Sequence, residues 1–449
     1  MSDDELFEGD RIEVTVGAPA HGGHCVARIG GPHGQVVFVR HALPGERVTA
    51  EVTELHKGYL RADAVEIHEA APERVTPPCA FAHPGGCGGC DLQHVAPAAQ
   101  LEWKAEVVRS LLGRMGGVSP ERIAELDVRV QPLPGGPLGW RSRVRYAVDA
   151  VGRPGLLKHR SHEVVPVDRC LIAHPELQKL DVTARLWPDA AAVEVVASSG
   201  GDISVRARPA ATPLLAPADA PAPGALVPGA LVPGGNGPAG VDTAASGAPA
   251  PGDEGPAEVS ELAIGRKWQV PPDGFWQVHP AAADTLVGAV LELLQPAEGE
   301  TSWDLYGGAG LFAAALAERT RARTTVIESA PVGVTAARTN LADLNGVEVV
   351  AARVDVALGR RRVTGPVDLV VLDPPRTGAG TKVVRAITTA RPRAVAYVAC
   401  DPAALARDVQ TFTAEGYRLA ELRAYDCFPM TQHIECVALF VPGYQPAVV

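Results

Sequence analysis

The stretch TSWDLYGGAGLFAAALAERTRARTTVIES, residues 301–329, decides the fold of this chain. A strand pattern runs up to Asp304, three glycines follow within residues 307–310, and an alanine-rich helix pattern leads to a second strand ending at Glu328. Glycines let the backbone turn sharply at a strand end and let a ligand lie against it. The order strand, glycine loop, helix, strand is typical of an α/β domain that binds a nucleotide-like ligand.

The same alternation of strands and helices continues from about residue 280 to residue 449, and it predicts a mostly parallel sheet covered by helices. Ligands of such sheets bind at the carboxyl ends of the strands. The glycine loop lacks the third glycine of the dinucleotide pattern G-x-G-x-x-G, which favours a methyl donor over NAD.

Acidic residues are expected at the ends of three successive strands. Glu328 in VIES ends the second strand, where a carboxylate can accept hydrogen bonds from both ribose hydroxyls of a cofactor. Asp355 in ARVDVA is predicted to end the third strand and to meet the adenine amino group. Each acid alone is often a surface residue, but the series that begins at Asp304 favours cofactor binding.

The rest of the chain divides by composition. Residues 9–66 contain short alternating runs separated by Gly and Pro, which predict a small β-barrel. A β-rich region follows between about residues 128 and 203. Residues 207–259 are dominated by Ala, Pro and Gly, and we expect a disordered insertion there because such a segment cannot bury enough apolar surface.

Composition limits the possible partners. The chain has 449 residues, 46% of them hydrophobic, and a formal net charge of -11. The acidic start MSDDELFEGD and the absence of a long apolar run predict a cytoplasmic protein without a membrane partner. Cations gather in the stretch 140–160, which is either a phosphate-binding surface or the solvated face of a hairpin: Arg141, Arg143, Arg145, Arg153, Lys158 and Arg160.

The eight cysteines are expected to be ligands or nucleophiles, because the cytoplasm keeps thiols reduced. Cys79, Cys87 and Cys90 cluster in a pattern that suits an iron–sulfur cluster or zinc. Cys400 in YVACDPAALARD stands between a strand and a helix, where the helix N-terminus is expected to stabilise a thiolate. The alternative for Cys400 is a buried structural cysteine.

Four stretches of the sequence resemble one family, the bacterial RNA (uracil-5-)-methyltransferases, over nearly the full length of the chain. They are CAFAHPGGCGGCDLQHV with a later DRC, FWQVHP, LDPPR, and the pair AYVACDPAALARD and YDCFPMTQHIE. The resemblance implies a multidomain α/β protein. Its expected parts are a TRAM- or OB-like RNA-binding β-barrel (1–68), a β-rich central iron–sulfur and RNA-binding domain (69–279), and a Rossmann-like methyltransferase domain (280–449).

The resemblance also implies a role for individual residues. Cys400 matches the covalent nucleophile and Glu435 in HIE matches the base, while Gln277, Tyr306 and Asp373 match positions beside S-adenosylmethionine. Asp373 can in addition accept a hydrogen bond from the uracil ring nitrogen. The resemblance implies a structural [4Fe–4S] cluster with four cysteine ligands: Cys79, Cys87, Cys90 and Cys170.

The barrel and the cysteine quartet resemble the branch of the family that modifies 23S ribosomal RNA. We therefore expect a monomer that acts on structured RNA, with no DNA partner. The nearest alternative is the T-loop uridine of transfer RNA. An alternative from another class is a non-catalytic iron–sulfur RNA-binding protein, in which Cys400 and Glu435 would be packing residues.

Overall fold

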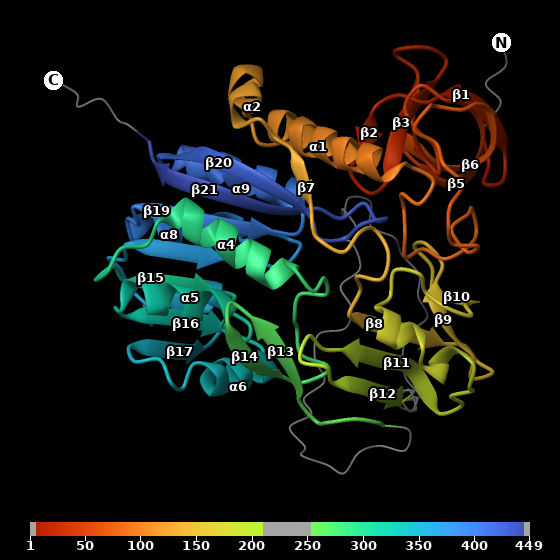
Figure 1. The fold of residues 1–449 in the computed structure, drawn as a ribbon. Helices are drawn as coiled ribbons and strands as arrows, with labels where there is room; N and C mark the ends of the chain where they lie inside the picture. Colours follow the sequence, from red (N-terminus) through yellow and green to blue (C-terminus); the bar gives the residue numbers. More distant parts are fainter. Residues whose placement is uncertain (1–5, 210–252, 444–449) are drawn as a thin grey trace, which may run out of the picture.

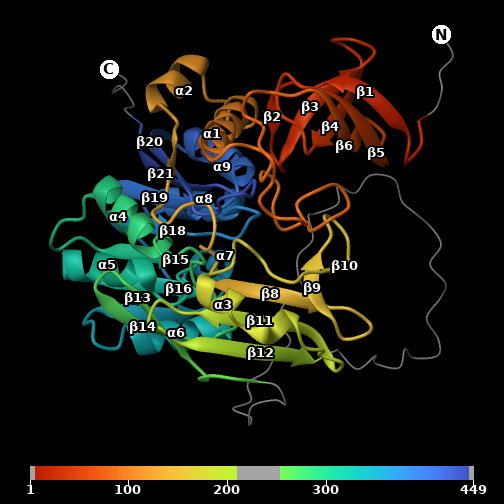
Figure 2. The same ribbon diagram turned by 45° about the vertical axis from the view of Figure 1, so that its right-hand side comes forward.

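The computed structural model describes residues 6–209 and 253–443, and Figures 1 and 2 show their arrangement from two directions. The strands of these residues form three sheets and one separate hairpin. None of the helices in these two ranges is both long enough and apolar enough to cross a bilayer.

The largest sheet lies in the C-terminal part of the chain. Its eight strands follow the order β17 (Val347–Ala351), β16 (Thr324–Glu328), β15 (Ser302–Leu305), β18 (Leu369–Leu372), β19 (Ala394–Ala399), β21 (Glu435–Pro442), β20 (Tyr417–Asp426) and β7 (Val130–Pro132). The strands from β17 to β19 pair in parallel, and β21 runs antiparallel to both β19 and β20. The predicted, mostly parallel sheet is therefore confirmed.

Helices cover both faces of this sheet (Figure 1). One face packs against α4 (Ala282–Leu294), α5 (Leu311–Thr320) and α6 (Pro331–Asn340). The other packs against α7 (Val354–Gly359), α8 (Gly380–Thr389), α9 (Pro402–Ala414) and α1 (Pro97–Arg114). All four residues of β18 are buried because neither face of the strand meets water, as expected for a parallel strand inside such a sheet.

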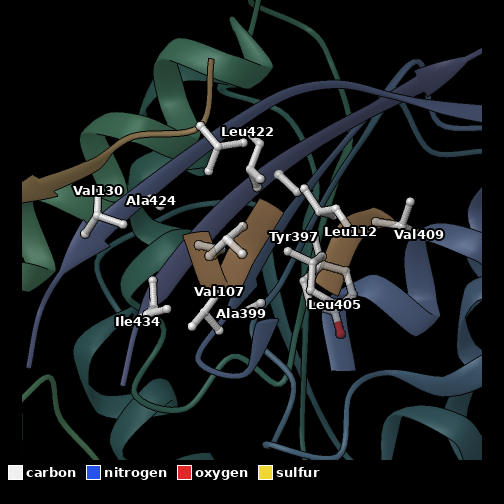
Figure 3. Packing of buried hydrophobic residues seen from close by; sticks show 14 of the residues in the cluster. Val107, Leu112, Val130, Tyr397, Ala399, Leu405, Val409, Leu422, Ala424 and Ile434 are labelled. Atoms are coloured by element: carbon white, nitrogen blue, oxygen red, sulfur yellow. The ribbon is translucent and has the colours of Figure 1, made fainter. Parts of the chain in front are cut away.

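Helix α1 and strand β7 precede the C-terminal part in sequence but belong to its packing. Val107 and Leu112 of α1 belong to one buried apolar cluster with Leu405 and Val409 of α9 (Figure 3). A short helix, α2 (Pro120–Leu126), follows α1, and β7 then pairs in parallel with β20 at the edge of the sheet. The N-terminal half of the chain is thus joined to the C-terminal sheet through a shared core.

The N-terminal sheet has six strands in the order β1 (Arg11–Thr15), β5 (Arg47–His56), β6 (Tyr59–Glu69), β4 (Gln35–Arg40), β3 (His24–Ile29) and β2 (Pro19–Ala20). All its pairs are antiparallel except β4 with β6. The strands agree with the alternating pattern of residues 9–66, while the closure of this sheet into a barrel stays a prediction.

The central sheet is antiparallel and has five strands. They are β10 (Val164–Pro166), β9 (Pro154–Leu157), β8 (Arg143–Val148), β11 (Ala190–Ala197) and β12 (Ile203–Pro209). A short helix α3 (Pro175–Gln178) and a single 3-10 turn η1 (Asp181–Thr183) precede β11, and a hairpin of β13 (Val259–Ala263) and β14 (Arg266–Val270) follows. The predicted insertion is shorter than 207–259, since β12 extends to Pro209 and β13 begins at Val259; its residues 210–252 lie outside the described part of the chain.

One buried ion pair links α1 to the end of β20. Lys104 is fully buried, and its Nζ donates to Asp426 Oδ1 at 2.6 Å and to the Phe428 carbonyl oxygen at 3.1 Å. Burial lowers the pKa of Lys104, and the charge of Asp426 opposes this shift. A charge that stays buried after its partner is removed is strongly destabilising.

We expect Lys104→Met to lower the free energy of unfolding by about 3–5 kcal/mol, because Asp426 is then buried without a cation. Urea unfolding followed by circular dichroism measures this change. The double variant Lys104→Met, Asp426→Leu should recover most of the loss, since no charge is left unpaired. Equal stability of the single variant and the wild type would contradict this account of the contact between α1 and β20.

Candidate active site

The glycine loop lies between β15 and α5, at the carboxyl edge of the large sheet. A Cβ on Gly307 would lie 2.5 Å from Val326 Cγ1, and a Cβ on Gly310 would lie 2.6 Å from Leu341 Cδ1. Gly310 also has a φ of 92°, a conformation that residues with a side chain rarely adopt. A side chain at either position would collide with Val326 or Leu341, so the loop packs tightly against β16 and the end of α6.

Asp304 and Glu328 hold this loop. Asp304 is fully buried, and its Oδ2 accepts a hydrogen bond from the Ala313 backbone N at 2.8 Å, in the first turn of α5. Burial and the charges of Asp373 and Glu328, against the opposing effect of this hydrogen bond, together raise the pKa of Asp304 to about 7. Glu328 at the end of β16 accepts from the Gly308 backbone N at 2.9 Å. The carboxyl groups of Asp304 in β15 and of Glu328 at the end of β16 therefore fix the conformation of the glycine loop.

Asp355 does not end a strand, so that prediction is wrong. Strand β17 ends at Ala351, and Asp355 lies in the first turn of α7, where its Oδ1 accepts from Arg353 Nε at 3.0 Å. The sequence ARVDVA contains the start of a helix, but its apolar pattern is too short to distinguish a helix start from a strand end. Asp355 still lies near Tyr306. Burial and the nearby charge of Asp355 together raise the pKa of Tyr306 to about 12.

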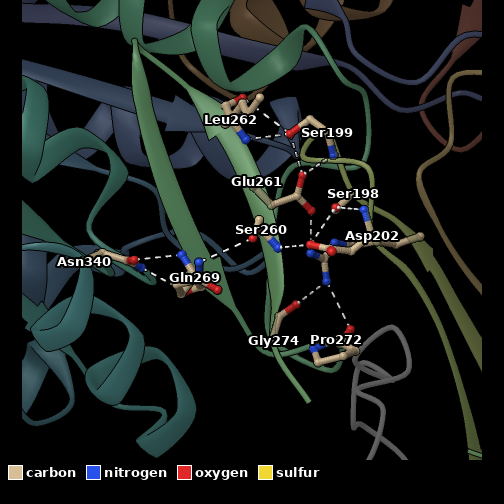
Figure 4. A network of polar contacts seen from close by, with 11 residues as sticks. Ser198, Ser199, Asp202, Ser260, Glu261, Leu262, Gln269, Pro272, Gly274 and Asn340 are labelled. Atoms are coloured by element: carbon tan, nitrogen blue, oxygen red, sulfur yellow. Dashed lines mark hydrogen bonds and ion pairs between the residues drawn. The ribbon is translucent and has the colours of Figure 1, made fainter. Parts of the chain in front are cut away.

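The segment that contains Gln277 is held by a polar network between the central sheet and the β13–β14 hairpin (Figure 4). Arg143 of β8 donates to the carbonyl oxygens of Pro272 and Gly274 at 3.1 and 3.2 Å, and to Glu261 Oε1 at 2.7 Å. Glu261 Oε2 accepts in turn from the backbone N and Oγ of Ser199 at 2.9 and 2.8 Å. Arg143 is therefore held in an internal ion pair and does not lie on a solvated face, whereas phosphate binding by the stretch 140–160 stays a prediction.

Gln277 and His279 follow this anchored turn and are both buried. The ring of His279 stacks on that of Trp140, with centroids 6.1 Å apart, and its Nδ1 accepts from the Ala281 backbone N at 3.2 Å. The path from β14 to α4 is thus fixed on both sides of Gln277.

Cys400 and Glu435 meet because of the register between β19 and β21. The final pair of this antiparallel ladder joins Ala399 to Cys436, so the next residues, Cys400 and Glu435, lie opposite one another at the edge of the sheet. Asp373 follows β18, the parallel neighbour of β19, and its backbone N donates to the Leu305 carbonyl oxygen at 3.2 Å. The structure therefore brings Cys400, Glu435 and Asp373 together beside the glycine loop.

Burial raises the pKa of all three groups, and neighbouring carboxyl groups add to the shift of Cys400 and Glu435. Burial raises the pKa of Cys400 to about 12, with further contributions from Glu435 and Asp373. Burial likewise raises the pKa of Asp373 to about 7, and burial together with Asp373 raises that of Glu435 well above its ordinary value. The expectation that the start of α9 holds Cys400 as a thiolate is wrong for the free protein, because burial and two neighbouring carboxyls outweigh the helix terminus.

Arg376 is a site residue that the sequence analysis did not single out, although the quoted motif LDPPR contains it. Its positive charge lowers the pKa of both Cys400 and Glu435, against the effect of burial. An arginine in this position favours the ionised forms of the thiol and the carboxyl group. The signal that could have identified it is its place three residues after Asp373, in a loop at a strand end.

Asp401 connects this edge of the sheet to the N-terminal sheet. Its Oδ1 accepts from the Ala404 backbone N at 2.7 Å and so caps α9, while Oδ2 lies 3.2 Å from Nε2 of His21, in the turn between β2 and β3. Burial opposes ionisation of Asp401, but the contact with His21 and the cap hydrogen bond lower its pKa. The residue after Cys400 is therefore held from two sides.

The four predicted metal ligands line one pocket of the central region: Cys79, Cys87, Cys90 and Cys170. Its wall also includes the apolar side chains of Phe81, Leu156 and Ile172 and the polar residues Gln93, Arg141 and Arg169. Burial raises the pKa of Cys87 to about 11 and also raises those of Cys90 and Cys170. Within residues 6–209 and 253–443, no group of three or more His, Cys, Asp or Glu side chains has the arrangement of a metal-ion site.

Comparison with known proteins supports the architecture. A family model described as TRAM domain matches residues 5–65, and one described as tRNA (Uracil-5-)-methyltransferase matches residues 364–441. An uncharacterized RNA methyltransferase of Streptomyces avermitilis is 46% identical over 446 residues, which cover 97% of this chain and 99% of that protein. The 23S rRNA (uracil(1939)-C(5))-methyltransferase RlmD of Acidithiobacillus ferrooxidans is 33% identical over 437 residues, 93% of this chain and 94% of RlmD.

A similar fold is found in a solved structure. The Pyrococcus abyssi tRNA (uracil-54, C5)-methyltransferase, in complex with S-adenosyl-L-homocysteine, matches 95% of this chain and 99% of its own with a TM-score of 0.66 at 21% identity. The predicted mixed α/β fold behind an N-terminal TRAM domain of strands is confirmed.

The electrostatics of Cys400 can be measured by alkylation. Because only the thiolate reacts, the alkylation rate of Cys400 should rise about tenfold per pH unit from pH 7 to 10 without a plateau. Iodoacetamide labelling followed by mass spectrometry of the Cys400 peptide measures it. At each pH Arg376→Gln should react more slowly than the wild type, because it raises the pKa of Cys400, and Glu435→Gln should react faster at any pH at which Glu435 is ionised, because it lowers that pKa. Arg376→Lys, which keeps the charge, is the control, and identical rates in all four proteins would contradict the account.

Proposed function

Because the chain belongs to the RNA (uracil-5-)-methyltransferase family, we propose that it methylates carbon 5 of a uridine in 23S ribosomal RNA through a covalent bond to Cys400. The observation that carries this proposal is the convergence of Cys400, Glu435 and Asp373 at one edge of the sheet, beside the glycine loop. A buried structural cysteine has no need of such neighbours.

The reaction needs a nucleophile because carbon 5 of uracil is too weakly nucleophilic to take a methyl group directly. Cys400 loses its proton to solvent, and the thiolate adds to carbon 6, which moves the electron pair of the carbon 5–carbon 6 double bond into an enolate. Carbon 5 then takes the methyl group. Glu435 accepts the proton from carbon 5, the double bond re-forms, and the bonding pair between carbon 6 and sulfur returns to Cys400.

The raised pKa values suit this sequence of steps. A thiol with a raised pKa gives a stronger nucleophile once it has ionised, and a carboxyl group with a raised pKa gives a stronger base. Arg376 favours the ionised forms of both Cys400 and Glu435. Asp373 is proposed to accept a hydrogen bond from the uracil ring nitrogen, which orients carbon 6 toward the sulfur of Cys400.

S-adenosylmethionine, when bound, supplies the methyl group without its electron pair. We propose that five residues bind this donor: Gln277, Tyr306, Glu328, Asp355 and Asp373. Glu328 is assigned to the ribose hydroxyls and Asp355 to the adenine amino group, because both carboxylates lie on the side of β15 toward β17. Tyr306 supplies an aromatic wall next to Asp355.

The 23S ribosomal RNA target is supported by the 33% identity to an enzyme named for that activity over nearly the whole of both chains. In this proposal the chain is a cytoplasmic monomer that binds RNA through residues 1–68 and 69–279 and carries the chemistry in residues 280–449. Transfer RNA is the alternative substrate, which the experiment below distinguishes.

We propose that Cys79, Cys87, Cys90 and Cys170 hold a [4Fe–4S] cluster. The proposal is supported by the four thiols that line one cavity, together with Phe81, Leu156, Arg141 and Arg169. Buried thiols with raised pKa values ionise only when a metal supplies the compensating charge. These residues would hold the cluster in a structural role, because methylation of uracil involves no electron transfer. Zinc is the alternative ion for four thiolates.

Trapping tests the nucleophile and the substrate together. Fragments of 23S ribosomal RNA transcribed with 5-fluorouridine should form a stable adduct with the protein in the presence of S-adenosylmethionine, because fluorine cannot leave as a proton. Cys400→Ala should form no adduct. Cys436→Ala is the control: it removes another buried thiol, next to Glu435, and should still form the adduct. An adduct in the Cys400 variant, or trapping only by a transfer RNA T-arm, would overturn the corresponding part of the proposal.

Anaerobic purification tests the metal. The protein should be brown and contain about four irons per chain. Cys90→Ser should lose the iron and melt at a lower temperature yet still bind S-adenosylhomocysteine, because the donor site lies on other elements. Cys25→Ser is the matched control, a buried thiol outside the pocket that should keep the iron. A colourless, fully active protein with one tightly bound zinc would refute the iron–sulfur assignment.

A further inference from the structure

The loop of residues 427–434 runs from the end of β20 to Glu435 and determines the position of the Glu435 side chain. Its backbone includes Met430 at a φ of 68°, in the left-handed region that residues with a side chain adopt only under constraint. Met430 and Thr431 are buried, and within the loop Thr431 Oγ1 donates to the Phe428 carbonyl oxygen at 2.8 Å. These internal contacts leave both backbone polar groups of Met430 to be satisfied from elsewhere.

Both groups are held by a segment more than 300 residues away in sequence. The Met430 backbone N donates to Gln100 Oε1 at 3.0 Å, and the Met430 carbonyl oxygen accepts from the Leu92 backbone N at 2.9 Å. Gln100 Nε2 donates to the carbonyl oxygens of Leu92 and Val95 at 3.0 and 2.8 Å, so its amide is fixed in one orientation. Gln100 is buried at the start of α1, which itself packs on the large sheet.

A third contact comes from Asp91. Its Oδ2 accepts from the Gln432 backbone N at 3.1 Å, while Oδ1 accepts from Arg40 Nη2 of β4 at 3.4 Å. Asp91, Leu92 and Gln100 therefore grip the loop at Met430 and Gln432, and we refer to these three residues as the clasp. The clasp directly follows Cys90 in the cysteine pocket.

We infer that the clasp positions Glu435 for the removal of the carbon 5 proton, an inference that rests on the proposed function. In that step the proton passes from carbon 5 to the Glu435 carboxylate, the freed pair re-forms the double bond, and the carbon 6–sulfur bond breaks toward Cys400. Proton transfer requires the carboxylate within hydrogen-bond distance of its target, and a small displacement slows the step strongly. Addition of Cys400 and methyl transfer depend on β19 and the glycine loop, which the clasp does not touch.

The two side chains of the clasp are thus positioning residues, and their loss should slow one step. Gln100→Met keeps the volume of the side chain but loses the acceptor for Met430 N and the two bonds to the 92–95 carbonyls. With unmodified 23S ribosomal RNA and excess enzyme, it should accumulate a covalent complex that carries the methylated base, with release slowed at least about tenfold. Its affinity for S-adenosylhomocysteine should stay within about twofold of the wild type.

Asp91 provides a matched pair of variants that does not depend on Gln100. Asp91→Asn and Asp91→Leu both lose the charge opposite Arg40, but only Asp91→Asn keeps an oxygen acceptor for Gln432 N. The complex should accumulate in Asp91→Leu and not in Asp91→Asn. Arg122→Leu is the control for general stability: it loses two hydrogen bonds from α2 to the carbonyl oxygens of Leu419 and Ala420 on β20, far from the loop, and should release product normally.

Glu435→Gln separates this inference from the proposed function. If Glu435→Gln accumulates the methylated complex while the folded clasp variants release product at the wild-type rate, the inference is wrong and the function stands. If Glu435→Gln itself turns over normally, the assignment of the base fails. Should Gln100→Met not fold, the two Asp91 variants decide, and equal release by both would overturn the role of the clasp.

Discussion

The antiparallel pairing of β21 with β19 is the constraint on which the rest of the site depends. At the carboxyl edge of a parallel sheet lie the residues that follow each strand. A strand that runs in the opposite direction begins at that edge, so its first residue lies there. Glu435 is the first residue of β21 and so lies opposite Cys400, which follows β19. Asp373 and the glycine loop reach the same edge from parallel strands. The proposed nucleophile, the proposed base and the glycine loop therefore converge through strand register alone.

Burial at this edge decides the chemistry of the groups that meet there. A thiol and two carboxyl groups share a site with little water: burial raises the pKa of all three, Asp373 adds to the shift of Glu435, and both carboxyl groups add to the shift of Cys400. Arg376 is the charge that opposes this effect. In the proposed mechanism the groups react strongly but only once ionised. The same logic applies to the cysteine pocket, where burial disfavours thiolates unless a metal stabilises them.

Local patterns predicted the parts of the fold that local sequence controls. The alternation of strands and helices, the glycine loop and the strand-end position of Cys400 all follow from periodicity and turn residues. Periodicity does not reveal partners, so the packing of α1 on the C-terminal sheet and the internal network of Arg143 were not foreseen. Asp355 was misplaced because a short helix start resembles a strand end. The direction of the pKa shift of Cys400 could not be predicted from the sequence, because it depends on the positions of Glu435 and Asp373, which follow from the strand register.

The central claim is that this chain uses Cys400 to make 5-methyluridine in 23S ribosomal RNA. The most direct test is mass-spectrometric mapping of 5-methyluridine in ribosomal and transfer RNA from a strain that lacks the gene. The account predicts loss of the modification from 23S ribosomal RNA, its return with the wild-type gene, and no return with Cys400→Ala. Restoration by Cys400→Ala, or a loss confined to transfer RNA, would contradict it.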